Sequence, residues 1–167
     1  MSRGFVKEED QEEAPIIPPR AALPAGVTNY VTPGGMEELL AERKELEKER
    51  AELEIIDETE RRRAQAVIDG KMSLLNERIN SARVLKPEDQ PQDEVRFGAT
   101  VHLKDAKGKF QEFAIVGVDE ADVKKQKIAF VAPIARAVTG KKEGETTEFQ
   151  LGSETRNLEI LKITYKK

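Results

Sequence analysis

Two apolar heptad patterns with a polar centre between them constrain the fold of this chain more than any other feature of its sequence. The first pattern places a leucine at every seventh residue, at Leu39, Leu46 and Leu53. The second alternates spacings of four and three, through Ile68, Met72, Leu75, Ile79 and Ala82. Both spacings align apolar side chains along one side of a helix, so each pattern predicts an amphipathic helix.

The polar centre is the run from Asp57 to Arg63, near the midpoint of the helical segment. Two apolar stripes on either side of a polar run favour an antiparallel helical hairpin, a short coiled coil, over residues 32–86. A single continuous helix is the alternative, because no proline or glycine marks a turn at the centre.

The segment before the helices, residues 1–31, has the composition of a tail. It contains the charge run Lys7 to Glu13 and four prolines, which exclude regular structure and favour a disordered or partly docked state. The helix is predicted to begin at Pro33, because Thr32 can cap it and proline loses no hydrogen bond at the first position. Gly34 and Gly35 weaken that first turn.

After the hairpin, a proline-rich and acidic linker over residues 87–94 breaks the helix. The apolar period then changes to two, which predicts strands over residues 95–167. Asp105 to Lys109 is predicted as a hairpin turn, and Pro133 to Val138 as a short helix. The expected fold class is therefore α+β, a helical hairpin followed by a small antiparallel β domain with one short helix.

Composition excludes several classes of site. The 167 residues include no cysteine, which removes disulfides and thiol chemistry, and one histidine, His102, which rules out a multi-histidine metal site. We interpret His102 as a structural strand residue. The net charge of −4 disfavours non-specific duplex binding. With no apolar run near the roughly 20 residues that span a bilayer, and no secretory signal, a cytoplasmic protein is expected.

Several short motifs follow one another in the C-terminal part. They are Gly98 to Val101, Ile115 to Asp122, Ala132 to Val138, and Gly140 to Lys142 followed by Gly144-Glu145. In this order and spacing the chain resembles the C-terminal domain of the bacterial Gre transcript cleavage factors, the GreA/GreB family. Ala132 and Val138 are mild departures from the serine and leucine usual there. The start Ser2 to Glu8 resembles a subset with a shortened coiled coil, similar to Rnk-type regulators.

The resemblance implies an FKBP-like fold for residues 95–167 and a contact with RNA polymerase at the rim of its secondary channel. The residues that the resemblance places at this contact are Asp119, Glu120, Asp122, Pro133, Ile134 and Arg136. Acidic groups beside an exposed proline turn offer charge complementarity with an apolar anchor. The alternative is a polar turn in which Arg136 pairs with one of the acids.

The resemblance fails at the centre of the hairpin. Family members carry an acidic tip motif that helps to hold the second catalytic Mg²⁺ of the polymerase, and this chain lacks it. Its hairpin is also shorter by about two helical turns per arm, roughly 11 Å of reach. Asp57, Glu58 and Glu60 are weak candidates to replace the missing carboxylates. The chain is thus expected to have no cofactor of its own and at most to share Mg²⁺ with the polymerase active centre.

Next to these acids, Arg61, Arg62 and Arg63 are candidates for contact with the nascent RNA or the channel wall, and a solvated face is the alternative. We expect a regulator that binds RNA polymerase without efficient transcript cleavage and is not itself an enzyme. Two alternatives stay open, a genuine cleavage factor that uses the tip acids and an FKBP-like peptide-binding module. No membrane or small-molecule substrate is expected as a partner.

Overall fold

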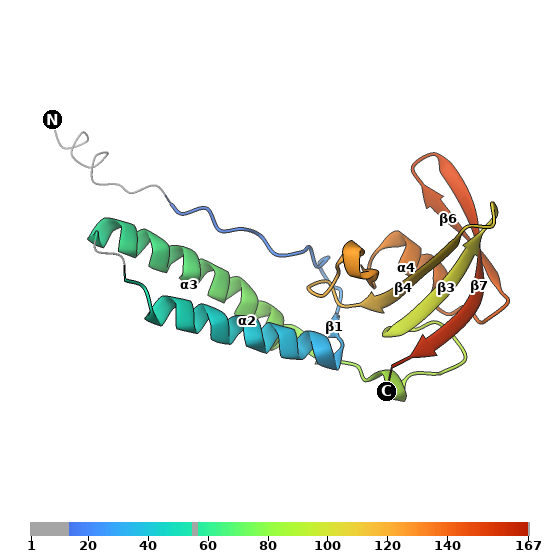
Figure 1. Ribbon diagram of the computed structural model, residues 1–167, viewed down its shortest axis with the longest axis horizontal. Helices are drawn as coiled ribbons and strands as arrows, with labels where there is room; N and C mark the ends of the chain where they lie inside the picture. Colours follow the sequence, from blue (N-terminus) through green and yellow to red (C-terminus); the bar gives the residue numbers. More distant parts are fainter. Residues whose placement is uncertain (1–13, 55–56, 167) are drawn as a thin grey trace.

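The computed structural model describes residues 14–54 and 57–166, and it places a helical hairpin at one end and a β domain at the other (Figure 1). The hairpin is formed by α2 (Pro33–Ala51) and α3 (Glu58–Ser81), which lie side by side. This confirms the α+β class and the order of hairpin and β domain. The predicted features of residues 1–13, including the charge run and the Ser2 to Glu8 match, lie outside the described residues.

The two apolar patterns pack against each other as predicted, but Leu53 lies beyond the end of α2 and Ala82 belongs to the strand that follows α3. Buried residues from both helices form one cluster, to which Val31 also belongs: Leu39, Leu46, Ile68, Leu75 and Ile79. The turn lies between Ala51 and Glu58, so the polar run Asp57 to Arg63 forms the start of α3 rather than the turn itself. A single continuous helix, the alternative interpretation, is wrong.

Each of the two hairpin helices begins at a side-chain cap. Thr32 accepts a hydrogen bond from the N–H of Gly35 at 2.9 Å, and Pro33 is the first residue of α2, as predicted. Asp57 Oδ1 caps α3 by accepting from the N–H groups of Thr59 at 2.8 Å and Glu60 at 3.2 Å. Both caps satisfy backbone donors that the first turn of a helix leaves unpaired.

The β domain contains a five-stranded sheet with the order β5-β4-β3-β7-β6. Its strands are β3 (Ala99–Asp105), β4 (Phe110–Val116), β5 (Lys127–Ala129), β6 (Thr146–Leu151) and β7 (Glu154–Tyr165). The sheet is mixed rather than antiparallel throughout, because β5 pairs with β4 in parallel. The connection through the short helix η2 (Val123–Lys125) leads the chain back to Ala114, in the second half of β4, where β5 begins, and β5 then runs in the same direction as β4.

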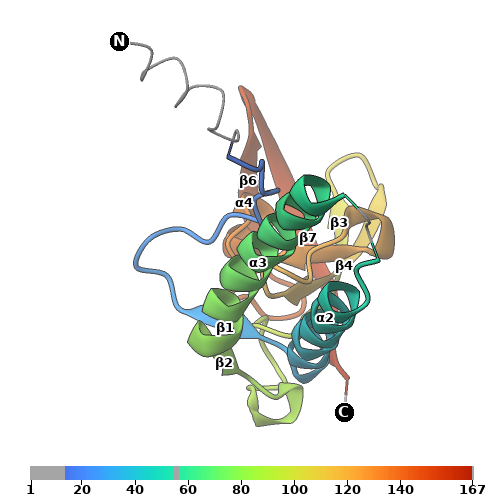
Figure 2. The same ribbon diagram turned by 90° about the vertical axis from the view of Figure 1, so that its left-hand side faces the viewer.

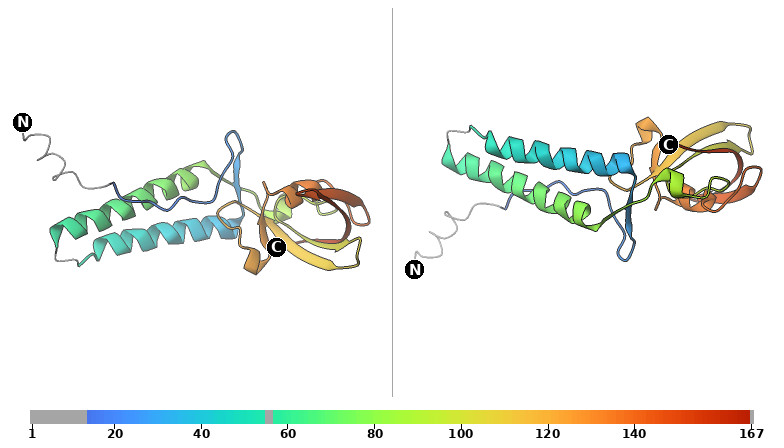
Figure 3. Two further views of the ribbon diagram at one scale, coloured as in Figure 1. Left: turned by 90° about the horizontal axis from the view of Figure 1, so that it is seen from above. Right: turned by 90° about the horizontal axis from the view of Figure 1, so that it is seen from below.

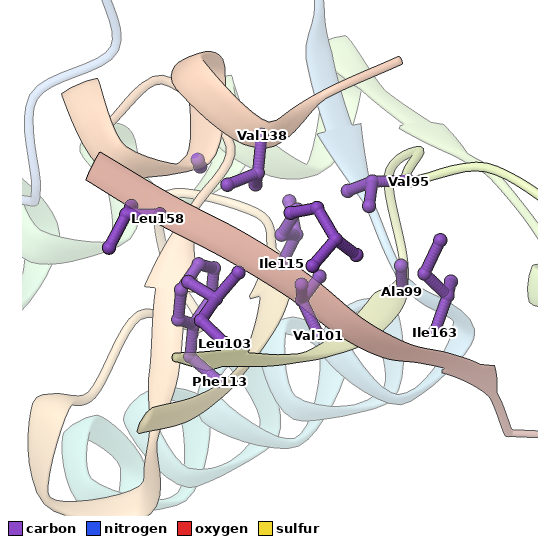
Figure 4. Close-up of a cluster of buried hydrophobic side chains, with 11 residues drawn as sticks. Val95, Ala99, Val101, Leu103, Phe113, Ile115, Val138, Leu158 and Ile163 are labelled. Carbon is purple, nitrogen blue, oxygen red and sulfur yellow. The ribbon is translucent and has the colours of Figure 1, made fainter. Parts of the chain in front are cut away.

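One face of this sheet and α4 (Pro133–Val138) enclose the core of the β domain, part of which Figure 4 shows. The α4 helix forms where predicted and contributes Ala135 and Val138. Val95 joins this core although it lies outside the strands, since it exchanges backbone hydrogen bonds with Gly140 and Lys141. The predicted linker begins with the short helix η1 (Pro87–Asp89).

A second, two-stranded sheet joins the N-terminal segment to the hairpin. Strand β1 (Asn29–Val31) pairs in parallel with β2 (Ala82–Val84), which directly follows α3 (Figure 2). Before β1, the described part of the N-terminal segment runs along the hairpin (Figure 3). The tail is therefore docked on the hairpin at Ile17 and Arg20. The prediction that residues 1–31 lack regular structure is wrong for their last three residues, because the backbone of β1 pairs with β2. Across the described ranges, no helix is long and apolar enough to cross a membrane.

Candidate functional site

The loop from Gly117 to Asp122 carries three acidic residues and lies where the hairpin meets the β domain. The Asp119 side chain is 5% exposed and forms ion pairs with Arg20 at 2.9 Å and Arg78 at 3.1 Å. Arg20 also binds Glu42 of α2 through its two terminal nitrogens, and this hydrogen bonding raises the pKa of the guanidinium. The carboxylate of Asp119 is therefore satisfied within the chain.

Glu120 is buried beside it and fastens the start of α2 to the loop. Its Oε2 accepts hydrogen bonds from the N–H groups of Gly117 and Thr32, both at 3.1 Å, and its Oε1 accepts from the Thr32 hydroxyl. This approach requires Gly35, because a Cβ there would lie 2.6 Å from Glu120 Cγ. The structure thus assigns Asp119 and Glu120, two of the predicted partner contacts, to bonds within the molecule.

Asp122 differs from the other two acids of the loop. It is half-buried, and its Oδ1 caps η2 by accepting from the N–H of Lys124 at 3.1 Å. Within the residues that the structure describes, it forms no ion pair. Its negative charge is therefore available to a partner in a way that the charge of Asp119 is not.

The α4 helix carries the three remaining predicted contacts. Pro133 is exposed at its first position, Ile134 packs against the core of the β domain, and Arg136 is exposed. Over residues 14–54 and 57–166, Arg136 has no ion pair, so the alternative in which it pairs with an acid of the loop is wrong. Asp122 and α4 lie beyond opposite ends of the short strand β5.

A shallow groove beside α4 brings together aromatic residues that the sequence analysis had not connected. Tyr30, Phe97 and Phe130 pack ring against ring with centroids 5.6 to 6.0 Å apart. The groove, of about 470 Å³, is also lined by Arg96 and Arg136. Arg96 is already paired with Glu94 at 3.3 Å. An apolar floor beside the Arg136 guanidinium suits a protein partner that offers an apolar side chain next to a carboxylate.

The hairpin tip holds the weak catalytic candidates. Asp57 uses Oδ1 to cap α3, while Glu58 and Glu60 are exposed in the first turn. Nowhere in the described part of the chain do three metal-ligating side chains gather into a potential site. The tip acids thus do not fit a metal site formed by this chain alone.

Arg61, Arg62 and Arg63 follow these acids in α3, where the first is half-buried and the other two are exposed. They lie on the helix rather than in the turn. His102 is in β3 with its Nδ1 3.7 Å from a carboxylate oxygen of Glu112, on the neighbouring strand.

Comparison with known proteins establishes the relationship of the chain. The family model "Transcription elongation factor, GreA/GreB, C-term" matches residues 90–165. The GreB factor of Neisseria meningitidis serogroup A is 34% identical over 155 residues, which cover 83% of this chain and 95% of that protein. The chain belongs to the GreA/GreB family of transcription elongation factors.

Other members of the GreA/GreB family match a smaller part of this chain. GreA of Hyphomonas neptunium is 40% identical over 103 residues, which cover 61% of this chain and 66% of the relative. The alignment therefore spans slightly less than two thirds of that factor. Among solved structures, a GreA/GreB factor from Nitrosomonas europaea gives a TM-score of 0.41 at 19% identity over 83% of this chain and 99% of its own.

The sequence analysis missed the residues that hold the junction of this GreA/GreB protein together. Arg20 lies in a proline-rich segment and Arg78 on an ordinary polar helix position, so neither had a local signal. The available signs of a close approach were two glycines at positions where they weaken a helix, Gly35 in α2 and Gly70 in α3.

Proposed function

We propose that this chain binds RNA polymerase at its secondary channel, in the cytoplasm, and modulates elongation without stimulating transcript cleavage. The family relationship supports the polymerase as the partner. The observation that carries the proposal against cleavage is the hairpin tip. The arms are short: α2 has 19 residues and α3 has 24, which correspond to lengths of about 28 Å and 36 Å. Asp57 is also committed to capping α3.

The β domain supplies the proposed contact. Asp122, Pro133 and Arg136 offer charge and an exposed apolar ring to the partner, and the aromatic groove beside α4 adds an apolar surface. We exclude Asp119 and Glu120 from the proposed polymerase contacts because their carboxylates are bonded within the chain. At the tip, Arg61, Arg62 and Arg63 are proposed to meet the channel wall or the nascent RNA.

Transcript cleavage by stalled elongation complexes of the cognate polymerase tests the proposal. We expect the chain to co-migrate with the polymerase and to leave the cleavage rate at its intrinsic level. Stimulated cleavage that disappears in the variant D57A/E58A/E60A would overturn it in favour of a genuine cleavage factor. Lack of co-migration would remove the polymerase as the partner.

The contact surface is tested with a matched pair of variants. We expect R136E to weaken co-migration about tenfold, because it reverses the charge that faces a partner carboxylate. E148Q, which alters an exposed residue of β6 outside the proposed surface, is expected to bind normally. Equal binding by both variants would place the contact elsewhere on the β domain.

A further inference from the structure

We infer that Asp119 is a positioning residue: Arg20 and Arg78 clamp its carboxylate and thereby fix the direction in which the hairpin leaves the β domain. Each oxygen of the carboxylate has its own guanidinium. Arg20 Nε lies 2.9 Å from Oδ1, and Arg78 Nη1 lies 3.1 Å from Oδ2. The clamp therefore joins the β domain to α3 directly and to α2 through the bond of Arg20 to Glu42.

The clamp is enclosed as well as charged. The side chains of Asp119, Arg20 and Arg78 are 5%, 18% and 15% exposed. Ion pairs shielded from water resist separation, since removing one partner leaves the others charged and poorly solvated. The geometry of the junction is thus fixed more firmly than by a surface ion pair such as Arg50–Asp69, whose side chains are 47% and 54% exposed.

Arg20 reaches Asp119 because the segment around it is anchored on both sides. Ile17 fits against Gly70 of α3, where an added Cβ would lie 2.7 Å from Ile17 Cγ1. On the other side, the carbonyl oxygen of Ala21 accepts a hydrogen bond from Arg78. This segment therefore acts as a strap that carries Arg20 into the space between hairpin and β domain.

Glu120 provides a second attachment one residue away. It binds Thr32 at the start of α2, whereas Asp119 binds the strap and α3. Because Asp119 and Glu120 hold different helices, the hairpin cannot rotate about one of these attachments without breaking the other. With only one attachment, a rotation of roughly 20° would move the end of a helix about 28 Å long by about 10 Å. That such a displacement would affect binding to polymerase rests on the proposed function, whereas the clamp itself does not.

Distances between hairpin and β domain test the clamp directly. The chain has no cysteine, so E49C in α2 and K104C in β3 provide two spin-label sites for pulsed electron paramagnetic resonance. We expect a narrow distance distribution in the otherwise unchanged chain. D119N is expected to broaden it about twofold or shift it, because the neutral side chain no longer holds two guanidinium groups. R20Q should broaden or shift the distribution in the same way. Because it alters only the strap, it provides the test if D119N fails to fold.

D122N is the matched control, since it neutralises an acid of the same loop that lies outside the clamp. It should leave the distance distribution unchanged. An unchanged distribution in both D119N and R20Q, or equal broadening in D122N, would overturn the inference. Polymerase co-migration separates this result from the proposed function: absence of binding by the unchanged chain refutes only the latter, because the distances are measured without polymerase.

Discussion

At the scale of single residues, the junction depends on glycine where a helix would prefer another residue. Gly35 weakens α2, yet its missing side chain is what admits the Glu120 carboxylate to the start of the helix. Gly117 has a similar role, because a Cβ there would lie 2.6 Å from the carbonyl oxygen of Tyr30. Local helix stability is thus reduced in favour of a close contact between two parts of the chain.

We expect G35A to lower the free energy of unfolding by about 2 kcal/mol, measured by chemical denaturation. Alanine favours helix by up to about 1 kcal/mol, but the new methyl group would displace the buried Glu120 from Thr32 and Gly117. G34A is the control, because the nearest atom to its Cβ is Thr32 Oγ1 at 3.9 Å. Equal stability of the two variants would show that Glu120 relocates without loss.

At the scale of elements, the hairpin tip shows that a carboxylate considered as a metal ligand can instead cap the start of a helix. Asp57 lies at the start of α3, where the N–H groups of Thr59 and Glu60 have no partner within the helix. Its oxygen satisfies both. The structural role of Asp57 follows from its position alone.

Replacing this cap should have a measurable effect on the hairpin. D57A is expected to destabilise the protein by about 1 kcal/mol, and amide hydrogen exchange in the first turn of α3 should accelerate. E58A removes a neighbouring carboxylate that caps nothing, so it should cost only a few tenths of a kcal/mol. A D57A variant as stable as E58A would contradict the assignment of Asp57 as the cap.

At the scale of the whole molecule, an aromatic cluster complements the ion-pair clamp. Tyr30 of β1 packs against Phe97 and Phe130 of the β domain, with ring centroids 6.0 and 5.6 Å away. Because β1 is paired with β2 at the end of α3, this contact links the hairpin to the β domain through the small sheet.

We expect Y30A to lower the free energy of unfolding by about 3 kcal/mol, since it removes a large side chain from a packed contact. Exchange of the amides in β1 and β2 should rise more than exchange in β3 and β7. F110A is the control, because the Phe110 side chain is exposed, at 70% for the residue. If Y30A changed exchange equally everywhere, the cluster would stabilise the β domain rather than the junction.

The sequence by itself determined those features that repeat or signal locally. The heptad spacing of Leu39 and Leu46 predicted the first helix, Thr32-Pro33 its start, and the proline-led segment Pro133 to Val138 a short helix. The motif order after residue 95 indicated the GreA/GreB family. Each of these features depends on residues that are close together in the sequence, so a pattern along the chain can predict it.

Only the tertiary structure decided what the acidic loop does and in which direction β5 runs. Asp119 meets Arg20 across 99 positions in the sequence, and Glu120 meets Thr32 across 88. No periodicity records such a pair, because the partners come together only after the hairpin has packed against the β domain. Whether an acidic side chain is paired within the chain or available to a partner therefore depends on which residues pack around it. Asp122 differs from Asp119 for that reason alone.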